Sequence, residues 1–333
     1  MSDQIDGVSV SELLARARGA RTAIEEQVAR RVFGQQEVVE LMLISLFARG
    51  HTLMMGVPGL AKTLLVSTLA EVLDLKFNRI QFTPDLMPSD ITGTDVLETD
   101  AETGRRVFRF MPGPVFSNLL LADEINRTPP KTQAALLQAM AERRVSVGGR
   151  TYDLEPPFLV FATQNPIEQE GTYPLPEAQL DRFMFHVEVD YPTLRDELEI
   201  ARRTTVDTRE PLSHVLTPAD ILALQKLVYH GVAGDTVVEY AVKLVRATRP
   251  GDPNATPEIG KYVSFGAGPR ATQYLILGAK ARAILRGYEA PSLDDVKALA
   301  PSVLRHRVLV NFHADADNVK PSDLIRQLVE RLK

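Results

Sequence analysis

Residues 52–63 have the pattern of a phosphate-binding loop, because a short apolar segment runs into a Gly/Pro turn and then into the start of a helix. Backbone N–H groups of such a turn point into one concavity, and the helix dipole favours an anion there. Lys62 is expected to reach the β- and γ-phosphates of a nucleotide, and the Thr63 hydroxyl to ligate Mg²⁺. A plain strand-to-helix turn with a surface lysine is the alternative. The nucleotide-binding residues predicted here are Gly56, Val57, Pro58, Gly59, Leu60, Ala61, Lys62 and Thr63.

One position departs from the usual G-x-x-x-x-G-K-[ST] pattern, since Ala61 stands where the second glycine is expected. Alanine adds one methyl group and adopts right-handed helical φ and ψ angles readily. We therefore expect Ala61 to begin a helix that runs to Leu73, and the loop to keep its function.

Two adjacent acids, Asp123 and Glu124, follow the apolar segment 117–122. This segment is typical of a strand buried on both faces at the centre of a parallel sheet. Carboxylates in such a place are disfavoured unless they have a partner, and a metal ion is one. Beside a phosphate-binding loop, Asp123 is expected to hold Mg²⁺ and Glu124 to polarise the attacking water. The alternative is an acidic N-cap for the next helix.

Three further polar residues could meet a nucleotide. Asn165 follows the apolar strand 158–163 and could align the attacking water, or it could form an ordinary Asn-Pro turn. Arg182 ends a short helix and could pair with Asp181 or Glu177, or project into a neighbour's nucleotide. Arg270 lies in the first turn of a helix, where a cation opposes the dipole, so we expect it to meet an anion. A phosphate or a simple ion pair would satisfy it.

The elements that must position these residues suggest two domains. The chain has 333 residues, of which 44% are hydrophobic and 24% charged, as in ordinary globular proteins. Helices are expected at 9–32 and 37–48, followed by alternating strands and helices up to about residue 191. The pattern then becomes mostly helical, with helices expected at 193–204, 217–229, 234–248, 270–287, 292–304 and 321–332. The sequence thus predicts an α/β core followed by a smaller all-α domain.

Two hairpins are expected within the α/β part. A turn-rich segment from residue 83 leads to strands at 95–98 and 106–110, joined by a turn at 100–104. This region is either a surface excursion or an insertion that touches another protein. Thr128 is expected to cap a helix that runs to about Arg144, and Gly148-Gly149 to turn a tight hairpin at 145–153.

Composition excludes several classes of protein. The net charge is −5 without a basic block, which argues against a surface that coats nucleic acid. The chain has no cysteine, and its six histidines show no metal-ligand spacing. The first residues do not have the pattern of a signal peptide, and no stretch approaches the length of a membrane span. We therefore expect a cytoplasmic protein without direct membrane insertion.

The order of these motifs resembles the MoxR family of AAA+ ATPases, from about Val32 to beyond Gly287. The resemblance implies a P-loop NTPase fold with a parallel-sheet core, helices on both faces and an all-α lid. It divides the chain into an N-terminal helix (1–31), a core (32–191) and a lid (192–333). It also implies a helix-2 insert at about 83–110 and a pre-sensor hairpin at 145–153. The segments that carry it are 56–63, 120–137, 163–166, 175–183 and 268–272.

The resemblance also implies roles for single residues. Lys62 and Thr63 are similar to the Walker A lysine and threonine, and Asp123 and Glu124 to the Walker B pair, so ATP and Mg²⁺ are the expected ligands. Asn165 is similar to sensor 1. Arg270 is similar to the sensor 2 arginine, and Arg182 to an arginine finger acting in trans.

Members of this family form rings, commonly hexamers. They usually pair with proteins that carry a von Willebrand factor A domain, in chaperone-like maturation of client complexes or in metal insertion. Three alternatives stay open: a magnesium-chelatase-like motor subunit, a nucleotide-gated assembly scaffold, and a nucleic-acid motor. The acidic balance of charge argues against the last of these.

Overall fold

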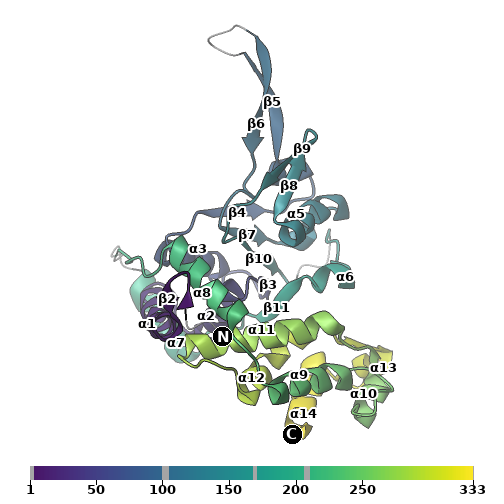
Figure 1. Ribbon diagram of the computed structural model, residues 1–333. Helices are drawn as coiled ribbons and strands as arrows, with labels where there is room; N and C mark the ends of the chain where they lie inside the picture. Colours follow the sequence, from purple (N-terminus) through teal and green to yellow (C-terminus); the bar gives the residue numbers. More distant parts are fainter. Residues whose placement is uncertain (1–3, 100–104, 168–170, 206–210, 333) are drawn as a thin grey trace.

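A five-stranded parallel sheet forms the centre of the first domain in the computed structural model, which describes residues 4–99, 105–167, 171–205 and 211–332. The strand order across the sheet is β11–β3–β10–β7–β4 (Figure 1). All four neighbouring pairs are parallel, so the carboxyl ends of the strands meet at one edge. The strands are β3 (His51–Met55), β4 (Phe77–Gln81), β7 (Leu119–Asp123), β10 (Leu159–Gln164) and β11 (Phe183–Glu188).

Strand β7 shows why the sheet is covered on both sides. Successive side chains of a strand point to opposite faces. Leu119 and Leu121 accordingly join one hydrophobic cluster, and Leu120 and Ala122 join another on the opposite face. The first cluster includes side chains of α1, α2 and α3, and the second includes those of α5. These helices are α1 (Val10–Val28), α2 (Gln36–Phe47), α3 (Lys62–Val72) and α5 (Pro130–Glu142).

Helix α5 begins later than expected. Thr128 is not its N-cap: the helix starts at Pro130, and Pro129 precedes it without a side-chain cap. Proline fits this place because the first helical N–H group has no partner in the helix in any case. The Thr128 hydroxyl is buried and has no hydrogen-bond partner among the described residues. The helix ends at Glu142, and Arg143 follows in the left-handed conformation.

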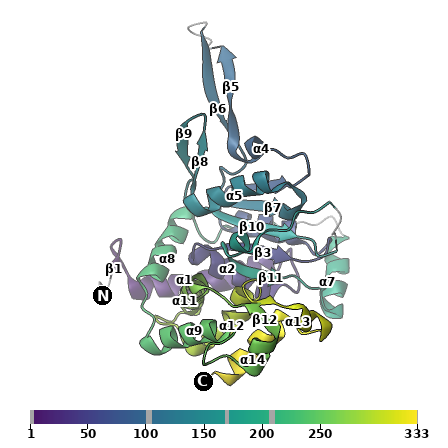
Figure 2. The same cartoon turned by 90° about the vertical axis from the view of Figure 1, so that its right-hand side faces the viewer.

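Two hairpins stand away from the sheet, side by side (Figures 1 and 2). The first is longer than expected, with β5 (Gly93–Thr99) paired to β6 (Arg106–Pro112) after a short helix α4 (Pro88–Thr92). Its expected turn at 100–104 lies outside the described residues. The second pairs β8 (Arg144–Val147) with β9 (Arg150–Asp153), and Gly148 and Gly149 both have positive φ, as predicted for a two-residue turn.

The second domain is a helical lid, with one departure from the all-α prediction: β12 (Val263–Phe265) pairs antiparallel with β13 (Leu309–Val310). Its longest helix is α11, which packs against α8, α9 and α12. The helices after the core are α7 (Leu194–Thr204), α8 (Pro218–His230), α9 (Asp235–Ala247), α10 (Pro257–Tyr262), α11 (Pro269–Leu285), α12 (Leu293–Leu304), α13 (Phe312–Ala316) and α14 (Pro321–Arg331).

The core and the lid share one hydrophobic interior. Helix α1, expected as a separate N-terminal helix, packs against α3 of the core and against α8 and α11 of the lid. The same cluster of buried side chains contains residues of α1, α2, α11 and α12. The remaining short elements are β1 (Gln4–Ile5), β2 (Val8–Ser9), a 3-10 turn (Ile125–Arg127) and α6 (Glu177–Leu180). Among the described residues, no helix combines the length and the apolar character needed to cross a membrane.

Candidate functional site

The loop between β3 and α3 has an unusual backbone at the position where the sequence departs from the common pattern. Ala61 has φ 55° and ψ 22°, so it is left-handed, and the helix begins at Lys62. The expectation of right-handed φ and ψ at Ala61 was therefore wrong. A left-handed alanine costs roughly 1–2 kcal/mol, because its Cβ approaches the following carbonyl oxygen. Backbone strain of this kind gathers at ligand-binding sites.

Gly56, at the start of the same loop, is required by close packing. A Cβ at this position would lie 2.7 Å from the carbonyl oxygen of Val189, which follows β11. A backbone atom cannot move aside as the end of a side chain can, so any larger residue would displace the loop. The Gly56 N–H also donates to the carbonyl oxygen of Gln164 at 3.3 Å. The loop is thus fixed against the two strands that flank β3.

The structure brings five predicted residues together around one pocket of about 450 Å³. Lys62 and Thr63 begin α3, Asp123 and Glu124 lie at the end of β7, and Asn165 follows β10. They meet because all three strands are parallel and end at the same edge of the sheet. Pro58, Gly59, Leu60 and Ala61 complete the loop side of the pocket.

The Lys62 ammonium group lies at the base of the loop, where it donates to the carbonyl oxygens of Gly56 and Val57. Partial burial lowers the pKa of Lys62 below its ordinary value, and the nearby carboxylates of Asp123 and Glu124 oppose that shift. A desolvated cation that faces two acids is suited to bind the terminal phosphates of a nucleotide together with a divalent metal ion.

Thr163 orients both acids, and the sequence analysis missed it. Its hydroxyl donates to Asp123 Oδ1 at 2.5 Å and accepts the backbone N–H of Glu124 at 2.9 Å. Glu124 has φ 58°, a left-handed conformation that is rare for glutamate. The hydroxyl of Thr163 therefore holds the Asp123 carboxylate and also helps to fix the strained backbone of Glu124. The available signal was a threonine near the end of a strand that neighbours β7.

Two residues of β4 bind the carboxylates, and the sequence analysis missed them as well. Arg79 forms an ion pair with Asp123 at 2.7 Å and donates to Gln81 at the same distance. Gln81 donates to Glu124 Oε2 at 2.7 Å, and Arg127 donates to the same oxygen at 3.0 Å. In a single copy of the chain, the charges of Asp123 and Glu124 are therefore balanced by arginines of the same chain. In the sequence, residues 76–82 show only the alternating apolar and polar pattern of an ordinary strand, so nothing there identified Arg79 or Gln81 as site residues.

Asn165 is buried, with 7% of its surface exposed, and its side-chain oxygen accepts the N–H of Ile167 at 3.1 Å. The Asn-Pro turn that we left open is thus present, and the same residue also lines the pocket. A side chain held in this way keeps a defined position at the end of β10, which a residue that aligns water would require.

The residues of this pocket fit Mg²⁺ better than a transition metal. Asp123 offers a carboxylate and Thr63 a hydroxyl, and Mg²⁺ is commonly held by one or two carboxylates together with phosphate oxygens and water. No group of three or more His, Cys, Asp or Glu side chains suited to a metal gathers in the described part of the chain. A metal held mainly by protein ligands is therefore not indicated there.

A second cavity, of about 530 Å³, adjoins the loop on the side of the lid. Gly56, Val57 and Leu60 line it together with the apolar side chains of Val38 and Leu41. The lid contributes Ser302, Arg305 and Lys320, and Arg305 pairs with Glu188 at 2.7 Å. A cavity that combines apolar and polar side chains beside a phosphate loop suits the base and sugar of a nucleotide.

Arg182 and Arg270 are not among the residues that line the pocket at the phosphate loop. Arg182 directly precedes β11, which pairs in parallel with β3, so it lies at the amino-terminal edge of the sheet. Its guanidinium donates to the carbonyl oxygen of Leu137 rather than to Asp181 or Glu177. Arg270 forms the ion pair that we kept as an alternative, with Asp181 at 2.8 Å. Both arginines are therefore at the edge opposite the phosphate loop of their own chain.

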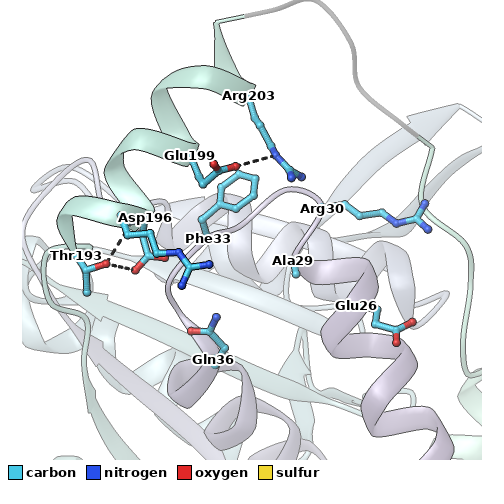
Figure 3. Close-up of a pocket in the computed structure, with 10 residues that line it drawn as sticks. Glu26, Ala29, Arg30, Phe33, Gln36, Thr193, Asp196, Glu199 and Arg203 are labelled. Carbon is cyan, nitrogen blue, oxygen red and sulfur yellow. Dashed lines mark hydrogen bonds and ion pairs between the residues drawn. The ribbon is translucent and has the colours of Figure 1, made fainter.

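Another cavity, of about 760 Å³, lies between the end of α1 and helix α7 (Figure 3). Two of its charged groups are paired with each other: Arg203 meets Glu199 at 3.3 Å, and Arg203 also lies over the Phe33 ring. Asp196 accepts the Thr193 hydroxyl at 2.7 Å. No predicted site residue lines this cavity, so volume alone does not identify the functional site.

Comparison with known proteins agrees with this geometry. Residues 51–185 match the family described as ATPases associated with various cellular activities (AAA), and residues 258–328 match the AAA lid domain. The chain is 45% identical over 304 residues to the chaperone MoxR1 of Mycobacterium tuberculosis, covering 91% of this chain and 79% of the relative. It is 33% identical over 336 residues to the protein MoxR of Methylorubrum extorquens, covering 96% of each.

A solved structure shows the same arrangement of both domains. A Cytophaga hutchinsonii protein that is provisionally described as an ATPase superposes with a TM-score of 0.90 at 39% identity, covering 97% of each chain. The parallel-sheet core, the helical lid and the relatives that match nearly the whole sequence lead to one assignment. The chain belongs to the MoxR family of AAA+ ATPases.

Proposed function

We propose that this protein hydrolyses ATP with Mg²⁺ at a site shared between neighbouring copies of a ring, and uses the energy to remodel partner proteins. The observation that carries the proposal is the meeting of Lys62, Thr63, Asp123, Glu124 and Asn165 around one pocket. A protein that only bound nucleotide would need the lysine and the threonine, but not a glutamate placed to polarise water.

Each side chain has a distinct task in this proposal. Lys62 binds the β- and γ-phosphates, and Thr63 and Asp123 hold Mg²⁺, which neutralises charge on the phosphates when bound. Glu124 polarises the attacking water, with Asn165 aligning it. In the chain by itself Glu124 is held by Gln81 and Arg127, so its carboxylate must turn away from them before it can act.

The placement of Arg182 supports a shared site. Strand β3 has 5 residues between the amino-terminal edge of the sheet and the phosphate loop. At about 3.3 Å per residue the two edges are about 17 Å apart, farther than an arginine side chain reaches. Arg182 can therefore meet a triphosphate only in another copy. Arg270, bound to Asp181 at the same edge, is expected to act on the neighbour as well.

A head-to-tail contact between unlike edges closes into a ring when its rotation allows, and we propose a hexamer. The name of the mycobacterial relative, a chaperone, supports remodelling as the role. A partner with a von Willebrand factor A domain and a client complex are part of this proposal, and nucleic acid is not. A magnesium-chelatase-like motor and a nucleotide-gated scaffold stay as alternative hypotheses.

The proposal is tested with two variants and a matched pair of controls. Glu124→Gln should bind ATP and scarcely hydrolyse it, whereas Lys62→Ala should lose ATP binding. The controls are Glu239→Gln and Lys243→Ala, an exposed ion pair on α9. Turnover is measured by phosphate release and binding by a fluorescent ATP analogue. Normal hydrolysis by Glu124→Gln would refute the role of that residue in activating water.

The biological role needs a second experiment. Glu124→Gln with ATP should hold its partner, which affinity capture and mass spectrometry would then identify. Recovery of a protein with a von Willebrand factor A domain would support the remodelling proposal. Recovery of nucleic acid alone, together with strong stimulation of ATPase activity by single-stranded DNA, would overturn it.

A further inference from the structure

A small cavity at the amino-terminal edge of the sheet gathers three arginines around about 290 Å³. Arg49 follows α2, Arg143 follows α5 and Arg182 precedes β11. We call this cavity the arginine pocket. The lid contributes the hydroxyl-bearing rings of Tyr229 and Tyr274, and the remaining lining residues are Ala48, His51, Met140 and Ala141.

Among the residues that the structure describes, no acidic residue lines the arginine pocket. No carboxylate of the described residues forms an ion pair with Arg49, Arg143 or Arg182, in a chain whose net charge is −5. By contrast, Arg270 and Arg307, which lie beside this edge, both pair with Asp181. A group of unpaired guanidinium groups in an acidic protein is a site for an anion.

The side chains leave donors available for a ligand. In the described residues, Arg49 donates one N–H to Gln225 and stacks on Tyr229, and Arg182 donates one to Leu137. No hydrogen bond of the Arg143 side chain is present within that part of the chain. His51 adds no charge, because burial lowers its pKa to about 4. A guanidinium has five N–H donors, so most of them are free to bind oxygen atoms.

Two of these arginines also occupy an unfavourable backbone conformation. Arg49 has φ 55° and Arg143 has φ 54°, a region that favours glycine. Arg143 directly follows the end of α5, and Arg49 lies one residue beyond the residue that follows α2. Glycine is the usual residue just past a helix end, where the helix dipole attracts a cation. The dipole gives a reason for a positive residue at one helix end. It does not explain why two such residues converge with Arg182 on one cavity.

We propose that the arginine pocket receives the terminal phosphate of the nucleotide held by the neighbouring copy, so that Arg143 and Arg49 act there together with Arg182. This inference rests on the proposed function, since it needs a nucleotide in the neighbour. It goes further because it assigns the contact to a built site of three arginines instead of a single residue.

The size and the place of the pocket favour this ligand. Pockets that enclose a whole drug-sized ligand measure about 300–1,000 Å³, so 290 Å³ suits a small anion or the end of a larger one. The pocket lies at the opposite edge of the sheet from the phosphate loop. Head-to-tail packing would bring these two edges together at each contact of a ring.

Arg143→Gly is the informative variant, because glycine removes the guanidinium and also suits the backbone at φ 54°. Its fold should therefore survive, as thermal unfolding would show. We expect kcat in the assembled form to fall about 10- to 100-fold, the effect of losing one charge-assisted hydrogen bond in the transition state. Binding of ATP to the phosphate loop should be unchanged. Arg144→Gln is the matched control, since this neighbouring exposed arginine does not line the pocket.

Mixing subunits tests whether the pocket acts on a neighbour. Arg143→Gly keeps its phosphate loop, and Glu124→Gln keeps its arginine pocket, so each supplies what the other lacks at a shared contact. We expect an equimolar mixture to hydrolyse ATP at least several-fold faster than the sum of the two variants alone. A mixture no faster than that sum would overturn the assignment to the neighbour.

The same experiment separates this inference from the proposed function. If the unmodified protein turns over ATP and Lys62→Ala does not, the proposed function stands. In that case a normal kcat in Arg143→Gly overturns the arginine pocket alone. A further experiment adds inorganic phosphate to Lys62→Ala and measures its thermal unfolding. If phosphate stabilises this variant against heat, Arg143→Gly abolishes that effect, and mixing subunits does not restore ATP hydrolysis, the ligand of the pocket would be free phosphate and not the neighbour's nucleotide.

Discussion

Asp181 joins the core to the lid through ion pairs with two arginines. We expect loss of its carboxylate to lower the free energy of unfolding mainly because one of these arginines, which is buried, then has no ionic partner. Its two carboxylate oxygens bind different arginines of the lid. Arg307 Nε lies 2.7 Å from Oδ1, and Arg270 Nη1 lies 2.8 Å from Oδ2. The Arg307 side chain is 2% exposed, whereas that of Arg270 is 48% exposed. One carboxylate thus makes a buried and an exposed ion pair.

The expected magnitudes follow from this difference. Leaving a buried charge without its partner costs about 3–5 kcal/mol. Arg307 also donates to the carbonyl oxygens of Asp181 and Phe183, which would remain. Because of these acceptors we expect Asp181→Asn to lower the free energy of unfolding by about 2–3 kcal/mol. Arg270→Gln should lower it by about 1 kcal/mol or less, as for other exposed pairs.

Urea unfolding followed by circular dichroism would measure both changes at equal protein concentration. With a slope near 3 kcal/mol per molar urea, Asp181→Asn should move the midpoint down by about 0.7–1 M. A change in Asp181→Asn no larger than that in Arg270→Gln would refute the reasoning, because the buried pair would then contribute nothing beyond the exposed one.

Three further predictions concern the site and its surroundings. Thr163→Val should reduce ATP turnover about 10- to 100-fold while ATP binding is retained, because the variant lacks the hydroxyl that holds Asp123 and Glu124. Thr163→Ser keeps a hydroxyl and should turn over ATP at close to the normal rate; equal turnover in both variants would contradict the role of that hydroxyl. Ala61→Gly should raise the free energy of unfolding by about 0.5–1 kcal/mol, because removing the strain of a left-handed alanine outweighs the extra entropy that glycine gives the unfolded chain. If Ala61 were right-handed in solution, urea unfolding would show a lower stability of the glycine variant. Burial lowers the pKa of His51 and of His186 to about 4, below the ordinary value of 6.5. As the pH falls, the histidines of the unfolded chain therefore take up protons before those of the folded chain. Their contribution to stability is complete above pH 6.5 and is lost progressively towards pH 4, by about 2 kcal/mol per histidine at pH 5. The free energy of unfolding, measured from pH 8 to pH 5, should therefore fall less in His186→Phe. Neither nitrogen of the replaced ring has a hydrogen-bond partner among the described residues, and an unchanged pH profile would contradict this account.

Much of the site could be predicted from the sequence because its main parts are local. The phosphate loop needs a strand, a tight turn and a helix in direct succession, and residues 52–63 contain all three. The acids at 123–124 follow an apolar run typical of a buried strand, and the structure confirms a buried strand there, β7, which lies between β10 and the edge strand β4. Helix periodicity likewise placed most lid helices within a few residues.

Contacts between distant segments could not be predicted in this way. Nothing near Thr163, Gln81 or Arg79 shows that these residues bind Asp123 and Glu124, because that depends on which strands lie beside β7. The left-handed Ala61 depends on the packing of the whole loop, and composition alone favours a helix there.

The sequence by itself determined the local chemistry of this protein: a lysine and a threonine at a helix start, two acids after a strand, and a helical second domain. Only the tertiary structure decided where each arginine lies. Parallel pairing of β11 with β3 places Arg182 at the edge opposite the phosphate loop, and the folding of α2 and α5 brings Arg49 and Arg143 beside it. The physical reason is that spacing along a chain specifies what each segment does alone, whereas strand order and packing specify which segments meet.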